Sequence, residues 1–168
     1  MKRTDIVVGP WGARFGGRFF PCSIGRGGRV AEKREGDGAS PLGVHRVVGM
    51  LYRPDRVGRG ALPDWARPIG PFDRWSDDPR DVEYNHYLPG AGPGRYSSER
   101  LARPDPLYDL ILITDYNWPF AEKGAGSAIF LHAWRKPRHP TEGCVAFRLP
   151  DLLWIANRFR HESRVIIR

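Results

Sequence analysis

The stretch GSAIFLHAWRKPRHPTEGCVAFRLPDLL, residues 126–153, contains the pattern that decides the predicted fold and the predicted chemistry. The apolar run at residues 127–134 predicts a β-strand with His132 close to its end. A second apolar element begins at Cys144, and the connection WRKPRHPTEG between them is polar and contains prolines. Because this connection is short, we expect the histidine and the cysteine to lie close together.

A histidine paired with a cysteine points to nucleophilic catalysis. A cysteine attacks as its thiolate, which is scarce at neutral pH because the free thiol has a pKa of ~8.5, so a nearby imidazole is needed to take the proton. We therefore predict Cys144 as the nucleophile and His132 as the general base and later acid. Gly143 has no Cβ, so substrate can approach the chain closely, and the backbone amides around Gly143 and Cys144 are the candidate donors to an oxyanion. The backbone carbonyl of Ala133 or the carboxylate of Asp115 would orient the second imidazole nitrogen.

Other interpretations of these residues stay open. A lone cysteine before an apolar run is more often a small buried residue, and a histidine among apolar residues more often belongs to a core. The second cysteine, Cys22, is expected to be such a buried thiol. A metal site is also conceivable, formed by His132, His139, Glu142 and Cys144. Because this spacing matches no standard zinc pattern, no metal is expected.

The composition is that of a folded protein with one domain. The 168 residues are 40% hydrophobic and include 6 tryptophans, which excludes a disordered chain. The length suits a single domain over residues 1–168. The formal charge of +8 comes mostly from arginines scattered along the chain, and no nucleic-acid-binding motif accompanies them. We expect a monomer without a nucleic-acid partner.

The N-terminal segment MKRTDIVVGPWGARF carries no recognisable export signal. It begins with basic residues, but Asp5, Pro10 and Arg14 interrupt it before an apolar region of the usual ~7–15 residues. No signal peptide is therefore visible. No stretch approaches the ~20 apolar residues of a membrane span, so no transmembrane segment is expected.

Short apolar runs bounded by glycine, proline, aspartate or asparagine predict a mainly β fold with one or two helices. No long helices separate these runs, which favours a mixed or antiparallel sheet. The expected strands are residues 5–8, 17–24, 29–33, 43–52, 110–114, 127–134 and 164–168.

One helix is expected within residues 149–162. Pro150 suits its first turn, and Asp151 suits its positive N-terminal end. Its buried face would consist of Leu152, Ile155, Ala156 and Phe159, which have the spacing of one helix face. The cations expected at its C-terminal end are Arg158, Arg160 and His161.

The middle of the chain, residues 54–106, is rich in proline, glycine, arginine and aspartate and has only brief apolar runs. So long a stretch inside a compact domain is more often a binding wall or lid than a disordered insert. Its aromatic residues support that interpretation, and they include Trp65, Trp75, Tyr84, Tyr87 and Tyr96. We expect this segment to form one wall of a cleft.

Residues 126–153 resemble the catalytic core of the bacterial L,D-transpeptidase family, in which a strand histidine precedes a Ser/Thr-x-Gly-Cys-hydrophobic signature. Thr141, Gly143, Cys144 and Val145 match the signature, and His132 matches the family histidine. Upstream, KREGDGASPLGVHRVVGMLYRPDR is similar to the family segment that leads into a core strand. The segments YDLILITDYN and YNHYLP resemble a compact proteobacterial branch of the family.

The resemblance implies a β-sandwich or barrel-like domain that acts on peptidoglycan stem peptides or muropeptides in cell wall biogenesis. The family's thiolate attacks the carbonyl of the third stem residue, commonly diaminopimelate, and expels the terminal D-alanine. An acceptor amine then yields a 3,3 cross-link or another amide, and water yields L,D-carboxypeptidase action. No cofactor is implied. The implied location is the periplasm or cell envelope, with the cytoplasm as an alternative because no signal peptide is visible.

Two positions depart from the family pattern. Glu142 stands where histidine is common, and Ala146 stands where arginine or asparagine is common. Arg148, two residues further on an extended chain, would share the face of position 146 and could bind a substrate carboxylate. The expected substrate-binding residues are Arg148, Thr141, Glu142, Tyr116, Asn117 and Ser127. If the two departures instead mark decay of the site, the domain would be a catalytically silent wall-binding module. An amidase that uses Cys144 and His132, or a zinc hydrolase, are further alternatives.

Overall fold

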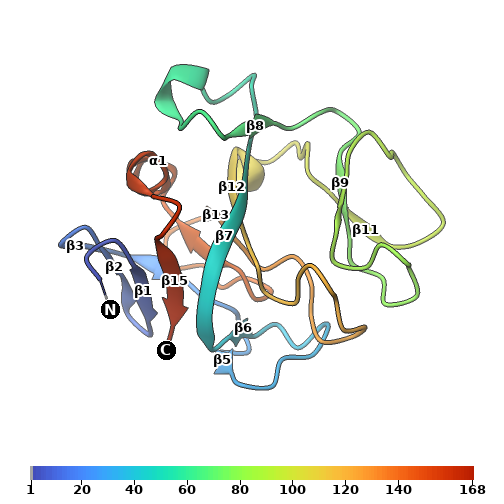
Figure 1. The fold of residues 1–168 in the computed structure, drawn as a ribbon, viewed down its shortest axis with the longest axis horizontal. Helices are drawn as coiled ribbons and strands as arrows, with labels where there is room; N and C mark the ends of the chain where they lie inside the picture. Colours follow the sequence, from blue (N-terminus) through green and yellow to red (C-terminus); the bar gives the residue numbers. More distant parts are fainter. Residues whose placement is uncertain (1) are drawn as a thin grey trace.

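The computed structural model describes residues 2–168, and a curved β-sheet dominates them (Figure 1). Within these residues the sheet has ten strands in the order β3-β2-β1-β15-β7-β12-β13-β14-β4, with β8 paired to β7. The strands are β1 Ile6–Gly9, β2 Gly12–Phe15, β3 Arg18–Phe20, β4 Cys22–Ser23, β7 Gly43–Tyr52, β8 Arg67–Pro68, β12 Leu110–Thr114, β13 Phe130–Ala133, β14 Val145–Phe147 and β15 Arg164–Ile167.

The two end strands of this sheet, β3 and β4, are consecutive in the chain, so the sheet curves almost to closure. Only Pro21 separates them, and proline interrupts a strand because it lacks an N–H and has a fixed φ. The prediction of one strand over residues 17–24 is therefore wrong. The predicted mainly β, barrel-like fold is confirmed, and β7 has the bounds that the sequence predicted.

The helix α1, Leu149–Arg158, follows β14 directly. Pro150 lies in its first turn together with Asp151, as predicted, and its buried residues are Leu152, Ile155 and Ala156. The helix ends at Arg158, so two of the three cations expected at its C-terminal end lie beyond it. Phe159 forms the C-cap and is buried.

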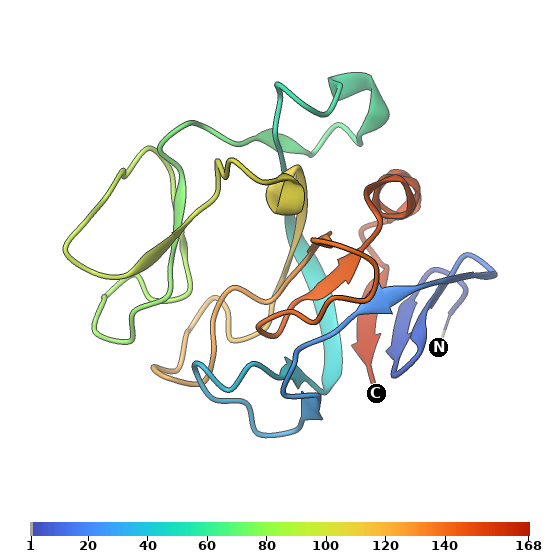
Figure 2. The same cartoon turned by 180° about the vertical axis from the view of Figure 1, so that it is seen from behind.

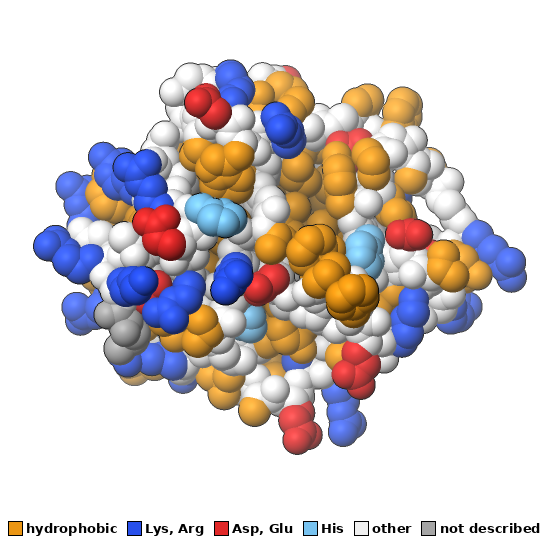
Figure 3. All heavy atoms as spheres, in the orientation of Figure 1, with side chains coloured by type: hydrophobic (Ala, Val, Ile, Leu, Met, Phe, Trp, Pro, Cys, Tyr) orange, Lys and Arg blue, Asp and Glu red, His pale blue; other side chains and the backbone are white. Residues whose placement is uncertain are grey.

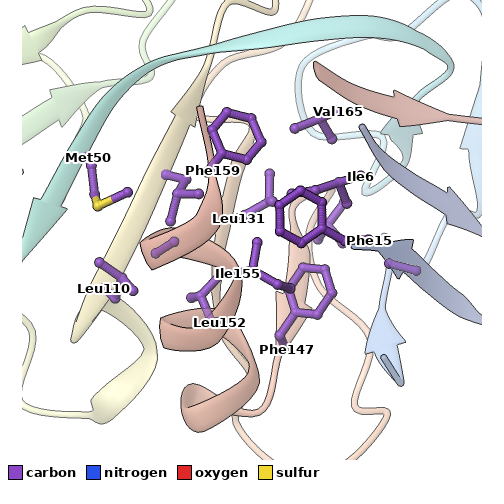
Figure 4. Close-up of a cluster of buried hydrophobic side chains, with 14 of the residues drawn as sticks. Ile6, Phe15, Met50, Leu110, Leu131, Phe147, Leu152, Ile155, Phe159 and Val165 are labelled. Atoms are coloured by element: carbon purple, nitrogen blue, oxygen red, sulfur yellow. The ribbon is translucent and has the colours of Figure 1, made fainter. Parts of the chain in front are cut away.

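The helix packs on one face of the sheet and closes the larger hydrophobic core. Figure 4 shows Leu152 and Ile155 of α1 among Leu131, Phe147 and side chains of β1, β2, β12 and β15. Each fully buried leucine or isoleucine contributes roughly 1.5–3 kcal/mol relative to exposure. This core fixes the strands β13 and β14 against the helix.

The opposite face of β12 and β13 packs against the middle of the chain, which forms a second, smaller core. A three-stranded sheet in the order β10-β9-β11 lies there, with β9 Arg74–Ser76, β10 Tyr87–Leu88 and β11 Ser98–Arg100. The ring of Trp75 meets Phe130 edge to face with centroids 4.9 Å apart. Figures 1 and 2 show this small sheet standing beside the large one. The middle segment is thus more regular than its composition suggested.

The remaining short elements are β5 Arg29–Val30, β6 Ser40–Pro41 and the 3-10 turns η1 Arg59–Ala61 and η2 Pro106–Tyr108. The basic side chains visible in Figure 3 are densest on the side of the molecule where β1 to β3 lie. Arg14 and Arg18 of this hairpin are exposed. Arginines that are scattered along the sequence therefore gather in part at one end of the sheet.

Candidate active site

A cavity of about 440 Å³ contains both residues of the predicted catalytic pair, His132 and Cys144. The strands β13 and β14 run parallel with His132 opposite Ala146. Cys144 lies two residues before Ala146, so in an extended chain both side chains project to the same face of the sheet. Ala146 also lines the cavity. The parallel register therefore brings the thiol and the imidazole to one hollow on the face away from α1.

The Cys144 side chain is half-buried and is held by two backbone groups. Its sulfur accepts the N–H of Phe130 at 3.4 Å, and its thiol donates to the carbonyl oxygen of Ala128 at 3.1 Å. Burial raises the pKa of the thiol to about 12, and the charge of Glu99 adds to this rise. The N–H of Phe130 and the cation of Lys33 oppose it. Cys144 is therefore a neutral thiol at neutral pH.

The His132 imidazole is buried and fixed at one nitrogen. Its Nδ1 lies 2.7 Å from the carbonyl oxygen of Ala133, the orienting group that the sequence predicted. A carbonyl oxygen only accepts, so Nδ1 carries the proton and Nε2 is left as the acceptor. Burial lowers the pKa of His132 to about 4, so the ring is neutral at neutral pH. The alternative partner, Asp115, instead accepts the backbone N–H of Arg46 at 2.8 Å.

A tight turn presents Cys144 to the cavity. Thr141 Oγ1 donates to the carbonyl oxygen of Cys144 at 2.6 Å and accepts the N–H of Gly143 at 3.2 Å. Gly143 has a φ of +139°, and a Cβ there would lie 2.8 Å from the carbonyl oxygen of Ala39. Only glycine fits this position without strain. Because the Gly143 amide already donates to Thr141, it is not free for the predicted oxyanion contact.

Ser40 ties this turn to the N-terminal part of the chain. Its hydroxyl donates to the carbonyl oxygen of Gly143 at 2.6 Å and accepts the N–H of Gly25 at 2.9 Å. Ser40 lies in the segment that resembles the family's entry into a core strand, and the sequence assigned it no role in the site. Its contact with Gly143 spans 103 positions, so no local pattern could have found it.

Three of the six residues predicted to bind substrate line the cavity, namely Ser127, Thr141 and Glu142. The side chain of Glu142 also pairs with Arg26, with 2.8 Å between Oε2 and Nε. It therefore faces solvent at the cavity rim and is partly neutralised.

The other three lie elsewhere. Arg148 precedes α1 and pairs with Asp151 at 2.9 Å, so it does not replace a cation at position 146. The hydroxyl of Tyr116 donates to the carbonyl oxygen of Ala125, and Asn117 binds the backbone of its own loop. These contacts organise the loop between β12 and β13. The predictions of substrate contact for Arg148, Tyr116 and Asn117 are not supported by their positions.

Asn85 is a site-supporting residue that the sequence did not single out. It is buried, and its Oδ1 accepts the N–H of Ala128 and the indole N–H of Trp75, each at 3.0 Å. Ala128 has a φ of +52°, which is strained for a residue with a Cβ. Asn85 thus fixes the strained residue Ala128, whose carbonyl oxygen accepts a hydrogen bond from the Cys144 thiol.

The middle segment, residues 54–106, supplies Asp77, Glu99 and Arg103 to the cavity lining. Leu107, the next residue after this segment, also lines the cavity. The ring of Tyr108 meets the His132 imidazole edge to face at 5.5 Å. Across residues 2–168, no three His, Cys, Asp or Glu side chains are grouped so that they could hold a metal ion. The side chains that line the cavity include a thiol, an imidazole and several charged groups.

A search against protein-family models matches residues 15–167 to the L,D-transpeptidase catalytic domain (YkuD). The chain belongs to the L,D-transpeptidase family. Searches of curated proteins and of solved structures find no match. Members of the family are in general cysteine-dependent enzymes that act on peptidoglycan, typically in the periplasm or cell envelope. In the described part of the chain, no helix is both long and apolar enough to cross a bilayer.

Proposed function

We propose that this chain is a cysteine acyltransferase that acts on peptidoglycan stem peptides, with Cys144 as the nucleophile and His132 as the general base and acid. One observation carries the proposal. Both residues line the same cavity, His132 from β13 and Cys144 from the position just before the parallel strand β14, and the Nδ1 contact with Ala133 leaves Nε2 as the acceptor. This is the arrangement that a thiol needs when its own pKa is too high for a thiolate.

The first half-reaction begins from a neutral pair. The thiol turns from Ala128 toward Nε2 of His132, and its proton passes there as the sulfur attacks the carbonyl carbon of the third stem residue. A C–S bond forms and the carbonyl oxygen becomes an oxyanion. When the tetrahedral intermediate collapses, the C–N bond to the terminal D-alanine breaks and the imidazolium returns its proton to the leaving amine. A thioester on Cys144 and free D-alanine remain.

In the second half-reaction an amine of another stem peptide attacks the thioester. His132 takes the proton from this amine, a new amide bond forms, and the C–S bond breaks. The imidazolium then returns the proton to the sulfur, so the pair is again neutral. The product is a 3,3 cross-link or another amide. Water in place of the amine gives L,D-carboxypeptidase action with the same proton transfers.

The oxyanion needs a backbone donor, and the sequence offered the amides around Gly143 and Cys144. Since Gly143 donates to Thr141, we assign this role to the amide of Cys144 itself, which the turn carries into the cavity. The hydroxyl of Thr141 holds the Cys144 carbonyl and so fixes the orientation of this peptide.

We also propose that the chain acts as a monomer and as a single catalytic domain over residues 1–168. Residues of the segment 54–106 line the cavity, which supports its role as a cleft wall. Because peptidoglycan is the proposed substrate, we propose that the protein acts in the periplasm or cell envelope.

The test is intact-protein mass spectrometry with a muropeptide tetrapeptide that ends in D-alanine. We expect wild-type protein to gain the mass of the tripeptide acyl group, and the C144A variant to gain none. Digestion should locate the adduct on Cys144. Added acceptor amine should convert the adduct to a cross-linked product, whereas slow release to water alone would favour the carboxypeptidase. Binding of the tetrapeptide without any adduct would refute the enzyme and favour a silent wall-binding module.

A further inference from the structure

The cavity wall supplied by the middle segment carries two carboxylates, Asp77 and Glu99. Glu99 on β11 lies directly opposite Trp75 on β9 in the antiparallel register of these strands. Asp77 lies two positions after Trp75 in the chain. Residues two apart on a strand share a face, so Asp77 and Glu99 are diagonal neighbours, which lie about 7–8 Å apart in such sheets. The small sheet therefore presents two negative charges to the hollow that contains Cys144 and His132.

One oxygen of the Asp77 carboxylate has no hydrogen-bond partner among the described residues. This atom, Oδ1, is buried. The adjacent cation does not reach it, because Arg80 is paired with Asp78, with 2.6 Å between Nη2 and Oδ2. Burying an acceptor without a partner costs free energy, and the cost is larger for a charged group. A ligand that supplies a donor at this point would remove that cost.

The charge of Glu99 is also incompletely balanced. Arg103 lies 3.4 Å from it, but the same guanidinium binds Asp105 with two contacts of 2.9 and 2.8 Å. Burial raises the pKa of Glu99, contact with Tyr108 and the charge of Arg103 lower it, and the charges of Asp77 and Asp105 raise it further. The negative charge of Glu99 also reaches Cys144. A cation bound between the two carboxylates would thus offset the effect of the Glu99 charge on the Cys144 thiol.

We propose that Asp77 and Glu99 form a subsite for a primary ammonium group of the substrate. An ammonium has three donors on a compact charge, so it can satisfy Asp77 Oδ1 and bridge to Glu99 at once. A metal ion is a poorer fit, since the described residues gather no three ligands here. The inference rests on the proposed function, and the ammonium can come from the side chain of the acyl donor or from the acyl acceptor.

The experiment compares two tetrapeptides with diaminopimelate at the third position, one with its side-chain amine free and one with it acetylated. Each is tested with wild-type protein, D77N and E99Q, and with E83Q as the control. Glu83 is an exposed acid of the same segment outside the cavity, so E83Q removes an equal charge without touching the subsite. The measured quantities are the rate of Cys144 acylation and the rate at which a preformed acyl-enzyme reacts with amine or water.

If the donor supplies the ammonium, D77N and E99Q should each slow acylation by the free-amine peptide about 10-fold, the usual size of one charge-assisted contact. The acetylated peptide should react slowly with wild-type protein and be insensitive to both variants. If the acceptor supplies it, acylation should be unchanged and aminolysis should fall about 10-fold, while hydrolysis stays constant. E83Q should match wild-type protein in every arm.

Equal rates for wild-type protein, D77N and E99Q in both steps would overturn the subsite while leaving the proposed function intact. If wild-type protein forms no adduct with either peptide, the proposed function fails, and the subsite is then tested by calorimetric binding to the C144A variant. Tighter binding of the free-amine peptide, lost in D77N C144A, would support the subsite. Equal affinity for the two peptides would overturn it.

Discussion

The buried, neutral His132 should make the stability of the fold depend on pH in a defined window. Its pKa is lowered from 6.5 to about 4 by burial, so between these values the unfolded chain binds a proton that the folded chain does not. The contribution of His132 is fully present above about pH 6.5 and is lost as the pH falls toward 4. At 1.36 kcal/mol per pKa unit, lowering the pH from 7.5 to 4.5 should remove about 2.5 kcal/mol.

The assay is urea unfolding of wild-type protein and of H132N at pH 7.5 and 4.5. Other groups titrate in this range, including the buried His45, whose pKa is also lowered by burial. They act in both proteins, so the difference between the two pH-dependent losses isolates His132. We expect wild-type protein to lose about 2.5 kcal/mol more than H132N. Equal losses would show that His132 is not held neutral, and the neutral-pair mechanism would fail with it.

Three further changes test the packing around the site. The free energy of unfolding of G143A in urea should fall by about 3 kcal/mol, because the new Cβ would lie 2.8 Å from the carbonyl oxygen of Ala39 at a φ of +139°. A loss below about 1 kcal/mol, which is the size of an ordinary surface substitution, would contradict the strained turn. The free energy of unfolding of K33M should fall by about 2 kcal/mol, because the substitution removes the Lys33 ammonium that lies 2.6 Å from the partly exposed Asp37 carboxylate. K33R, which keeps the positive charge, should recover most of this loss. The variant L152A should lower stability by about 3 kcal/mol without changing thiol alkylation of Cys144, since Leu152 is fully buried on the face of the sheet away from the cavity. Altered alkylation in L152A would show that the two cores are coupled.

The parts of the site that the sequence predicted are those encoded by nearby residues. His132, Ala133 and Cys144 lie within a single strand-turn-strand unit, so the spacing of apolar and polar residues was enough to predict their proximity. The α1 helix followed from its apolar spacing and from Pro150. In each case the sequence pattern lies within the structural element that it predicts, or only a few residues from it.

The failures have a common cause in contacts between distant segments. Arg148 was expected in the site because it shares a strand-like spacing with position 146, but the chain has already turned into α1 there and Asp151 takes its charge. The strands β9, β10 and β11 contain only two or three residues each, too few for a periodic pattern to mark. They lie beside β13, where the ring of Trp75 on β9 packs against the ring of Phe130.

The sequence by itself determined the chemistry, a thiol and an imidazole joined by a short connection, because the spacing of these groups along a β-rich chain is a local property. Only the tertiary structure decided their protonation states and their surroundings. Burial makes both groups neutral, and the register of β9 with β11 brings Asp77 and Glu99 to the same cavity. Burial and register arise when distant strands pack together, and no short window of sequence contains that information.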